Sequence, residues 1–281
     1  MISLLLALLT AAPQAQAAPV PPVCVGETFV SWEACAEAAE EGTPAHAFAM
    51  INLGSQAYMQ GDRAGALRFY DKAGESRQVT SDVIFHAFRG DTYRYAGRMD
   101  EARADAQIAW GYLNGRLPEG VSPADARPVD DNVRFTVLAT ILPIFKDSDP
   151  AFGEARDLFV ALPTSDWMTL SQRANTLTQL GEHAAAVADS KRAVDLQPAE
   201  PMLQNNHCYT LVEAGRAGEG LPYCERAIAL VPEVAPVRHS YAAALAALGQ
   251  CAAADRQLAE ARRIEPEATL YREALACTPK G

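Results

Sequence analysis

The chain has 281 residues and a formal net charge of −11, with 35 aspartates and glutamates against 24 lysines and arginines. This balance argues against nucleic acid and anionic lipid as partners, because both bind basic surfaces. The six cysteines are an even number, which favours three disulfides if the chain is exported.

Residues 1–17 are predicted to be a signal peptide. The apolar run at residues 2–9 is far shorter than the roughly 20 residues that span a bilayer. Ala15-Gln16-Ala17 fits the small-residue cleavage pattern, although no lysine or arginine precedes the apolar run. We therefore expect a periplasmic or secreted protein with no stable membrane insertion after cleavage. The alternative is a chain tethered to the membrane by an uncleaved N-terminal segment.

Residues 18–46 are predicted to form an N-terminal segment with a short helix. Cys24 and Cys35 bracket a loop in this segment. A disulfide between them would tie down the mature N-terminus, and closing a loop of this size contributes about 3 kcal/mol in the chain-entropy model.

A pattern of small residues then recurs along the chain. A small residue is followed after 12 positions by a second one and after 7 more by a third. Three such sets step by 34 residues and are closed by prolines 198, 232 and 266; two earlier sets lie 36 residues apart. The five sets are Gly54/Ala66/Ala73, Gly90/Ala102/Ala109, Ala174/Ala186/Ala193, Cys208/Gly220/Ala227 and Ala242/Ala254/Ala261.

This pattern resembles the tetratricopeptide repeat family, with glycines 61, 97, 181, 215 and 249 at the turns. The resemblance implies an all-α fold, an α-solenoid of stacked antiparallel helix pairs whose first helices line a concave groove. It places two repeats at residues 47–110 and three at 166–266. Residues 111–131 are then a loop or hinge, and residues 267–281 a C-terminal capping helix and tail. Larger residues, among them Leu196 and Leu230, are expected to fill the space between repeats.

Residues 132–165 match the pattern only in part. They read as a helix pair, but Pro143 stands where the small residue belongs. This degenerate pair is either a divergent repeat or a separate domain.

The repeat frame also places the remaining cysteines. Cys208 precedes the turn near Gly215 by 7 residues and Cys224 follows it by 9, so their levels differ by roughly 3 Å. A disulfide between the two helices is feasible; two buried thiols, a metal site or a nucleophile are the alternatives. Cys277, at the end of the capping helix, is expected to meet Cys251 at the start of the last second helix.

Signatures of catalysis are missing from the sequence. It contains no G-x-S-x-G, P-loop or H-E-x-x-H motif, and its five histidines are scattered. No nucleophile is predicted to have a base within one repeat, and no cofactor or metal is expected. We predict a non-catalytic scaffold for a protein or peptide partner. The alternatives are an enzyme or enzyme-accessory subunit with a site in the degenerate pair, and a self-assembling structural element.

The resemblance also implies which residues face a ligand. Asn175 and Asn206 match the paired asparagines that hold a peptide backbone in the family; the alternative is helix-surface polarity or an interhelix hydrogen bond. Ser171, Pro236 and Ser240 replace the lysines and arginines that capture a C-terminal carboxylate, so such capture is not expected. The candidate binding residues are Tyr58, Asp91, Arg94, Asn175, Thr178, Asn205, Asn206 and Tyr209.

Overall fold

The computed structural model describes residues 20–26, 30–74, 82–119, 121–123, 126, 128–146 and 149–278. The predicted signal peptide lies outside these residues. Within them every regular element is a helix, and the α-helices are numbered α1 to α13. The fold consists of two compact units, unit 1 up to Pro128 and unit 2 from Val129, and each is described by itself. No helix in the described part of the chain is both long and apolar enough to cross a bilayer.

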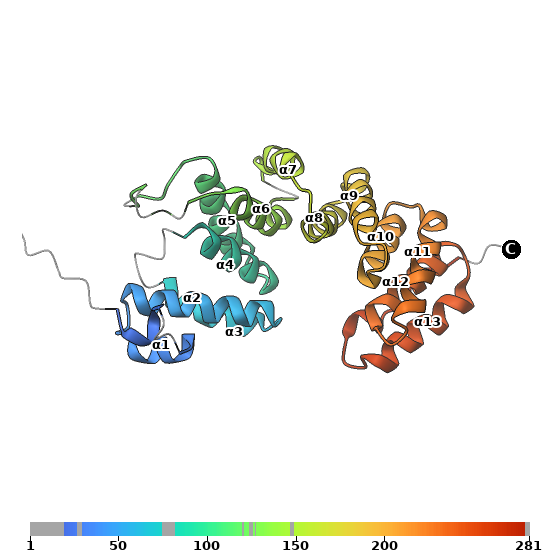
Figure 1. Ribbon diagram of the computed structural model, residues 1–281, viewed down its shortest axis with the longest axis horizontal. Coiled ribbons are helices and arrows are strands. Elements are labelled where there is room, and N and C mark those ends of the chain that lie inside the picture. The colour runs from blue at the N-terminus through green and yellow to red at the C-terminus, as the bar shows by residue number, and fades with distance from the viewer. Residues whose placement is uncertain are drawn as a thin grey trace, which may run out of the picture. The chain divides into compact units, whose positions relative to one another are not determined.

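Unit 1 is built from two helix pairs that follow a short N-terminal helix. Side chains of Ser31, Thr43 and Asp82 accept hydrogen bonds from backbone N–H groups and so cap the helices that follow them. The elements, seen in blue to green in Figure 1, are a 3-10 turn at Pro22–Cys24, α1 (Trp32–Ala38), α2 (Pro44–Met59), α3 (Arg63–Gly74), α4 (Val83–Tyr95) and α5 (Met99–Leu113).

The small residues of unit 1 allow its helices to approach closely. A Cβ at Gly54 on α2 would lie 2.6 Å from the ring of Tyr70 on α3, so any larger residue would displace this fully buried ring. Tyr70 in turn meets Phe85 of α4 edge-on, with ring centroids 5.9 Å apart. Ala66 and Ala73 complete the same core.

Unit 2 contains four helix pairs, drawn from light green to red in Figure 1. The degenerate pair packs against the first regular pair, and its helix continues through Pro143 to Phe145. The eight helices are α6 (Asp131–Phe145), α7 (Phe152–Ala161), α8 (Trp167–Leu180), α9 (His183–Leu196), α10 (Pro201–Glu213), α11 (Ala217–Leu230), α12 (Ala235–Ala247) and α13 (Cys251–Ile264).

Glycine is required at the turns inside the three regular pairs. Gly181, Gly215 and Gly249 have φ angles of 81°, 72° and 75°, in the left-handed region that side chains with a Cβ rarely adopt. These turns hold the two helices of each pair side by side, which is the arrangement that the 34-residue step predicts.

Two of the leucines expected to fill the space between repeats are exposed. Leu196 and Leu230 are 50% and 53% exposed, whereas Leu177, Leu211 and Leu245 are buried. Leu196 and Leu230 are the last residues of α9 and α11. Both side chains are half-exposed at a helix end, so the prediction for these two was wrong.

One buried arginine contributes to the attachment of the degenerate pair to the regular pairs. Arg173 on α8 is 5% exposed and forms a two-pronged ion pair with Asp189 on α9, with N···O distances of 2.5 and 3.0 Å. Its third nitrogen donates to the carbonyls of Val160 and Leu162 at the end of α7, at 3.1 and 2.8 Å. These carbonyls would otherwise lack partners, because the last turn of a helix has none of its own.

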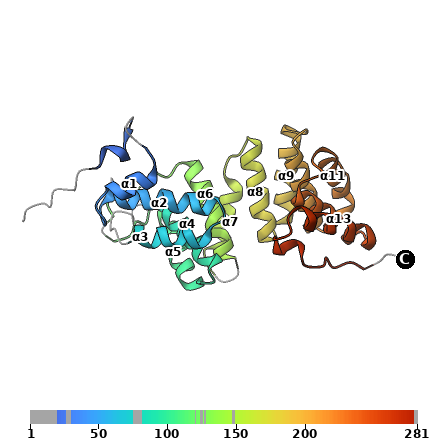
Figure 2. The same cartoon turned by 90° about the horizontal axis from the view of Figure 1, so that it is seen from below.

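The capping helix predicted within residues 267–281 does not form. Its described part has one 3-10 turn, Thr269–Tyr271, followed by chain without regular structure (Figure 2). The 14 residues of α13 span about 20 Å, and a helix from residue 269 to 277 would span only about 13 Å. Cys277 must return to Cys251 at the other end of α13, and only a more extended chain reaches that far. Buried Tyr271 still covers the last apolar face.

Candidate functional site

A chain of amide and hydroxyl groups crosses the first helices of unit 2. Asn205 on α10 donates through Nδ2 to Oδ1 of Asn206 at 3.2 Å, and Asn206 donates to Oγ of Ser171 on α8, also at 3.2 Å. Asn205 is 5% exposed, and its Oδ1 is buried without a donor. The predicted alternative of an interhelix hydrogen bond is therefore present at Asn206, and peptide binding by these residues stays a prediction.

The other predicted residues of unit 2 lie on the same two helices. Asn175 is exposed on α8. Thr178 donates to the carbonyl of Ala174 at 2.8 Å, and its hydroxyl lies 3.4 Å from that of Thr210 on α10. Tyr209 is half-buried; burial first, and then the carboxylate of Glu213, raise the pKa of its hydroxyl.

The first helices of the three regular pairs, α8, α10 and α12, carry almost no accessible charge. Arg173 is the only charged residue of α8, and it is buried in its ion pair. Glu213 is the only charged residue of α10. On α12, Arg238 is engaged with the carbonyl of Pro232 at 2.8 Å and with Oε1 of Gln257 at 2.7 Å. The surface therefore offers neutral donors and acceptors, which suit peptide amides better than ions.

In unit 1 the three predicted residues are brought together, but they satisfy one another. Tyr58 on α2 donates to Oδ2 of Asp91 on α4, and Arg94 donates twice to Oδ1 of Asp91, at 2.9 and 2.7 Å. Asp91 is only 3% exposed. Its carboxylate thus acts as an internal fastener between α2 and α4, and burial followed by this carboxylate raises the pKa of Tyr58.

Two residues that the sequence analysis missed complete this cluster. The guanidinium of Arg63, at the start of α3, lies 3.8 Å from the ring centre of Tyr58 and 4.7 Å from that of Tyr95. Arg94 lies 4.3 Å from the Tyr95 ring centre, and Tyr95 is 57% exposed. The family resemblance points to first helices, whereas Arg63 opens a second helix; its place directly after the Gly61-Asp62 turn was the available signal.

Comparison with known proteins identifies the architecture. A family model described as tetratricopeptide repeat matches residues 159–277, from within α7 to Cys277. This stretch belongs to the tetratricopeptide repeat family. The regular pairs α8–α9, α10–α11 and α12–α13 are thus tetratricopeptide repeats, as the 34-residue step predicts.

Solved tetratricopeptide repeat structures share the fold over most of the chain. A tetratricopeptide repeat protein from Parabacteroides merdae has a TM-score of 0.56 at 14% identity, covering 83% of this chain and 84% of that one. PilW, a widely conserved type IV pilus biogenesis factor, has a TM-score of 0.52 at 16% identity, covering 80% and 96%. At these identities the likeness shows the fold alone. No curated protein matches the chain in sequence.

The cysteines of the repeats and of both ends are all paired. The structure joins Cys208 to Cys224 within the second tetratricopeptide repeat and Cys251 to Cys277 across the tail, with Cα–Cα distances of 5.4 and 5.6 Å. Cys24 and Cys35 are joined at 4.8 Å. These are the pairs predicted from the sequence, and no free cysteine is left as a metal ligand or nucleophile.

One hydroxyl and one imidazole meet across two adjacent repeats, which is a place that the expectation for a single repeat does not cover. Ser190 Oγ on α9 lies 2.8 Å from Nδ1 of His207 on α10, because adjacent tetratricopeptide repeats bring positions 17 residues apart into contact. Both residues are only 2% exposed. Burial, and then the charge of Lys191, lower the pKa of His207 to about 4. A substrate has no access to this pair, which fastens one repeat to the next.

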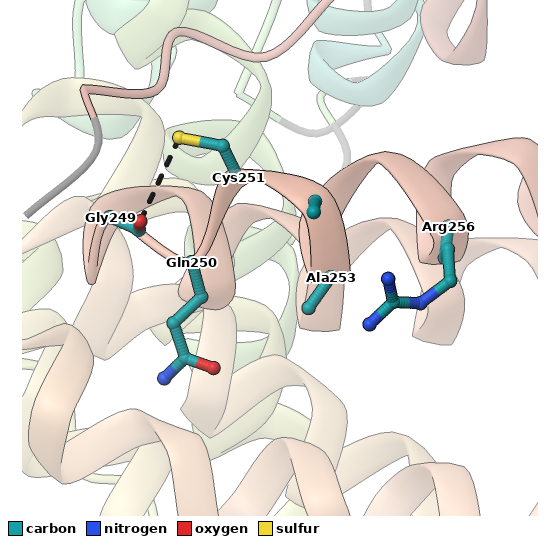
Figure 3. A pocket seen from close by; sticks show the side chains of 6 residues that line it. Gly249, Gln250, Cys251, Ala253 and Arg256 are labelled. Carbon is teal, nitrogen blue, oxygen red and sulfur yellow. Dashed lines mark hydrogen bonds between the residues drawn. The ribbon is translucent and has the colours of Figure 1, made fainter.

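Two further kinds of site, a metal cluster and a pocket, can be assessed in the described part of the chain. Within the described ranges, no three histidine, cysteine or acidic side chains are grouped so that they could hold a metal ion. A shallow surface depression lies at the turn of the last tetratricopeptide repeat (Figure 3). Its lining includes Gly249, Cys251 and Ala253, and its longer polar side chains, Gln250 and Arg256, point in different directions. This depression lacks converging polar groups.

Proposed function

We propose that this protein is a non-catalytic scaffold whose first helices in unit 2 bind a protein or peptide partner. The observation that carries the proposal is the chain of neutral polar groups from Asn205 through Asn206 to Ser171, which spans α8 and α10. Repeats of this kind present their first helices as an extended concave surface.

The remaining hydrogen-bonding capacity of these groups fits a peptide backbone. Asn206 uses one N–H and one lone pair within the protein, so one of each remains. Oδ1 of Asn205 has no donor, and a buried acceptor in that state costs about 1–3 kcal/mol. A partner N–H that reached it would recover this energy. Tyr209 supplies an apolar face with a polar tip, the usual make-up of an anchor residue.

We further propose that the protein works in the periplasm or outside the cell. The three disulfides support this, because such bonds persist in oxidising compartments. N-terminal sequencing of the protein from the envelope fraction should find a mature chain that begins near Ala18. An intact Met1 on protein isolated from the cytoplasm would contradict the proposed compartment.

Site-specific crosslinking tests the binding surface. A photoreactive amino acid at the exposed Asn175 should capture a partner in the envelope, whereas the same group at Glu225, exposed on the second helix α11, should not. The captured protein, once purified, should bind Asn206→Ala about fivefold more weakly, as expected for one lost hydrogen bond of about 1 kcal/mol. Equal crosslinking at both positions, or unchanged affinity of Asn206→Ala, would place binding elsewhere.

A further inference from the structure

The cluster of Tyr58, Arg63, Asp91, Arg94 and Tyr95 in unit 1 is charged, unlike the neutral surface of unit 2. We propose that Arg63 and Arg94, together with the exposed ring of Tyr95 that both contact, bind an acidic side chain of the protein partner. This inference rests on the proposed scaffold function and adds to it the class of residue that the partner must carry. The three residues meet where α2 ends, α3 begins and α4 ends.

The first step of the argument is the balance of charge. Both oxygens of Asp91 are used, Oδ1 by Arg94 and Oδ2 by the hydroxyl of Tyr58. Among the described residues, no carboxylate lies within ion-pair distance of Arg63. The cluster therefore holds two guanidinium groups and one carboxylate, and so carries one positive charge in excess.

The second step is the bonding capacity of Arg63. Its Nη1 donates to the carbonyl of Tyr58 at the end of α2. A guanidinium has five N–H groups in a planar fork, so this single bond positions the group and leaves most of its donors unused. Stacking on the Tyr58 ring at 3.8 Å fixes the plane of the fork further.

The third step is access from solvent. Tyr95 is 57% exposed and the side chain of Arg94 is 25% exposed, so a ligand can reach the cluster without unfolding it. A pre-positioned arginine fork pairs with a carboxylate through two charge-assisted hydrogen bonds. The protein as a whole has a net charge of −11 and repels acidic segments, so this local positive charge would orient an acidic partner.

Short peptides test the proposal on the mature protein. The probe is a labelled peptide that alternates glutamate with glycine and is blocked at both ends, so that only side-chain carboxylates are available. Its matched forms carry glutamine or phosphoserine in place of glutamate. The variants are Arg63→Gln, which keeps a donor for the Tyr58 carbonyl, and Tyr95→Ser at an exposed position. Arg68→Gln, on an exposed arginine of the same helix α3, is the matched control.

We expect the glutamate peptide to bind about tenfold more tightly than the glutamine peptide in fluorescence anisotropy at low salt. Arg63→Gln should remove this preference and Tyr95→Ser should reduce it severalfold, while Arg68→Gln should change affinity less than twofold. Equal weakening by Arg63→Gln and Arg68→Gln would show general charge attraction and overturn the proposal. So would binding of the phosphoserine peptide alone, or no preference for glutamate.

The failure of this inference can be told apart from failure of the scaffold function. If the partner crosslinked at Asn175 binds Arg63→Gln as tightly as the unaltered protein, while Asn206→Ala weakens it, the scaffold function stands. Only the acidic contact at Arg63 is then wrong. Circular dichroism melting of each variant establishes that it is folded before its affinity is compared.

Discussion

The same arginine–aspartate pair fastens one helix pair in each unit. In unit 1, Arg89 on α4 donates through Nε and Nη2 to the two oxygens of Asp105 on α5, at 2.7 and 2.8 Å. In unit 2, Arg173 and Asp189 make the same two bonds between α8 and α9. The aspartate follows the arginine by 16 residues in both cases, so the two pairs occupy equivalent places in the repeat.

The surroundings of the two pairs differ. Arg173 is 5% exposed and also holds backbone carbonyls at the end of α7, so it ties three helices together. The side chain of Arg89 is 20% exposed, and its partner Asp105 also bonds Nδ1 of His86 at 2.9 Å. Burial raises the pKa of Asp105, but the bonds from Arg89 and His86 outweigh it and hold that pKa below its ordinary value. The same pair thus serves a three-helix junction in one unit and a two-helix contact in the other.

The largest expected effect comes from breaking the pair in unit 2. Arg173→Met should lower the free energy of unfolding by about 3–5 kcal/mol, because it leaves Asp189 buried without its partner. Arg89→Met should cost less, about 1–2 kcal/mol, because Asp105 keeps its bond to His86 and water reaches the vacated side. Urea unfolding of the mature protein measures both.

A double variant shows whether the loss comes from the orphaned charge. Arg173→Met with Asp189→Leu should be more stable than Arg173→Met alone, since an apolar pair of similar volume replaces a buried ion pair at little cost. Equal losses for Arg173→Met and Arg89→Met would mean that the contacts to α7 contribute nothing, and the contrast between the two units would then disappear.

The next largest effect concerns α10 and α11, which are joined by a disulfide rather than by an arginine–aspartate pair. Cys208 and Cys224 are 0% and 1% exposed and join α10 to α11. Replacing both with alanine should cost about 3 kcal/mol, the chain-entropy value for a loop of this length. Thiol labelling of the unaltered protein, denatured without reductant, should give no adducts. Labelling of Cys208 or Cys224 there would show that two buried thiols occupy the site.

Much of this architecture could be predicted because the repeat fixes backbone positions. The small sites, the turn glycines and the prolines lie where helices must touch or end, so helices α8–α13 and the pair Cys208–Cys224 followed from the spacing. The structure of the tail could not be predicted in this way. Its sequence pattern favours a helix, but only a more extended chain allows Cys277 to reach Cys251. The arginine–aspartate pairs were also missed. Their separation of 16 residues joins two different helices, so it matches no period within one helix. The pairing becomes evident only when two repeats are aligned.

In the next repeat, His207 occupies the position equivalent to Arg173, and Tyr223 occupies the position equivalent to Asp189. The two rings meet edge-on with centroids 4.5 Å apart, so a neutral contact replaces the ion pair. Burial lowers the pKa of His207 to about 4, against an ordinary value of 6.5. The unfolded chain therefore binds a proton below about pH 6.5 that the folded protein takes up only near pH 4. Stability should fall through this window as pH decreases.

The size of this pH effect is on the order of 3 kcal/mol between pH 7 and pH 4. His207→Phe should flatten the slope of unfolding free energy between pH 6.5 and 5, above the range where most carboxylates titrate. An unchanged slope would show that His207 gains a proton in the folded protein as easily as in the unfolded chain, and that its pairing with Tyr223 does not depend on the neutral ring.

The smallest expected effect tests whether Asp189 is held by Arg173 alone or by a network that includes Arg192. Arg192 is a second cation near Asp189, at 3.5 Å, and it donates to the carbonyl of Thr164 at 3.0 Å. Its side chain is 54% exposed, so water and salt screen the interaction. Arg192→Ala should therefore cost no more than about 0.5 kcal/mol, and the difference should vanish in 1 M salt. That result would mean that the Asp189 carboxylate depends on Arg173 alone. A loss above about 1.5 kcal/mol would instead make Arg192 part of the junction. Asp189 would then resemble Asp105, which also has two partners.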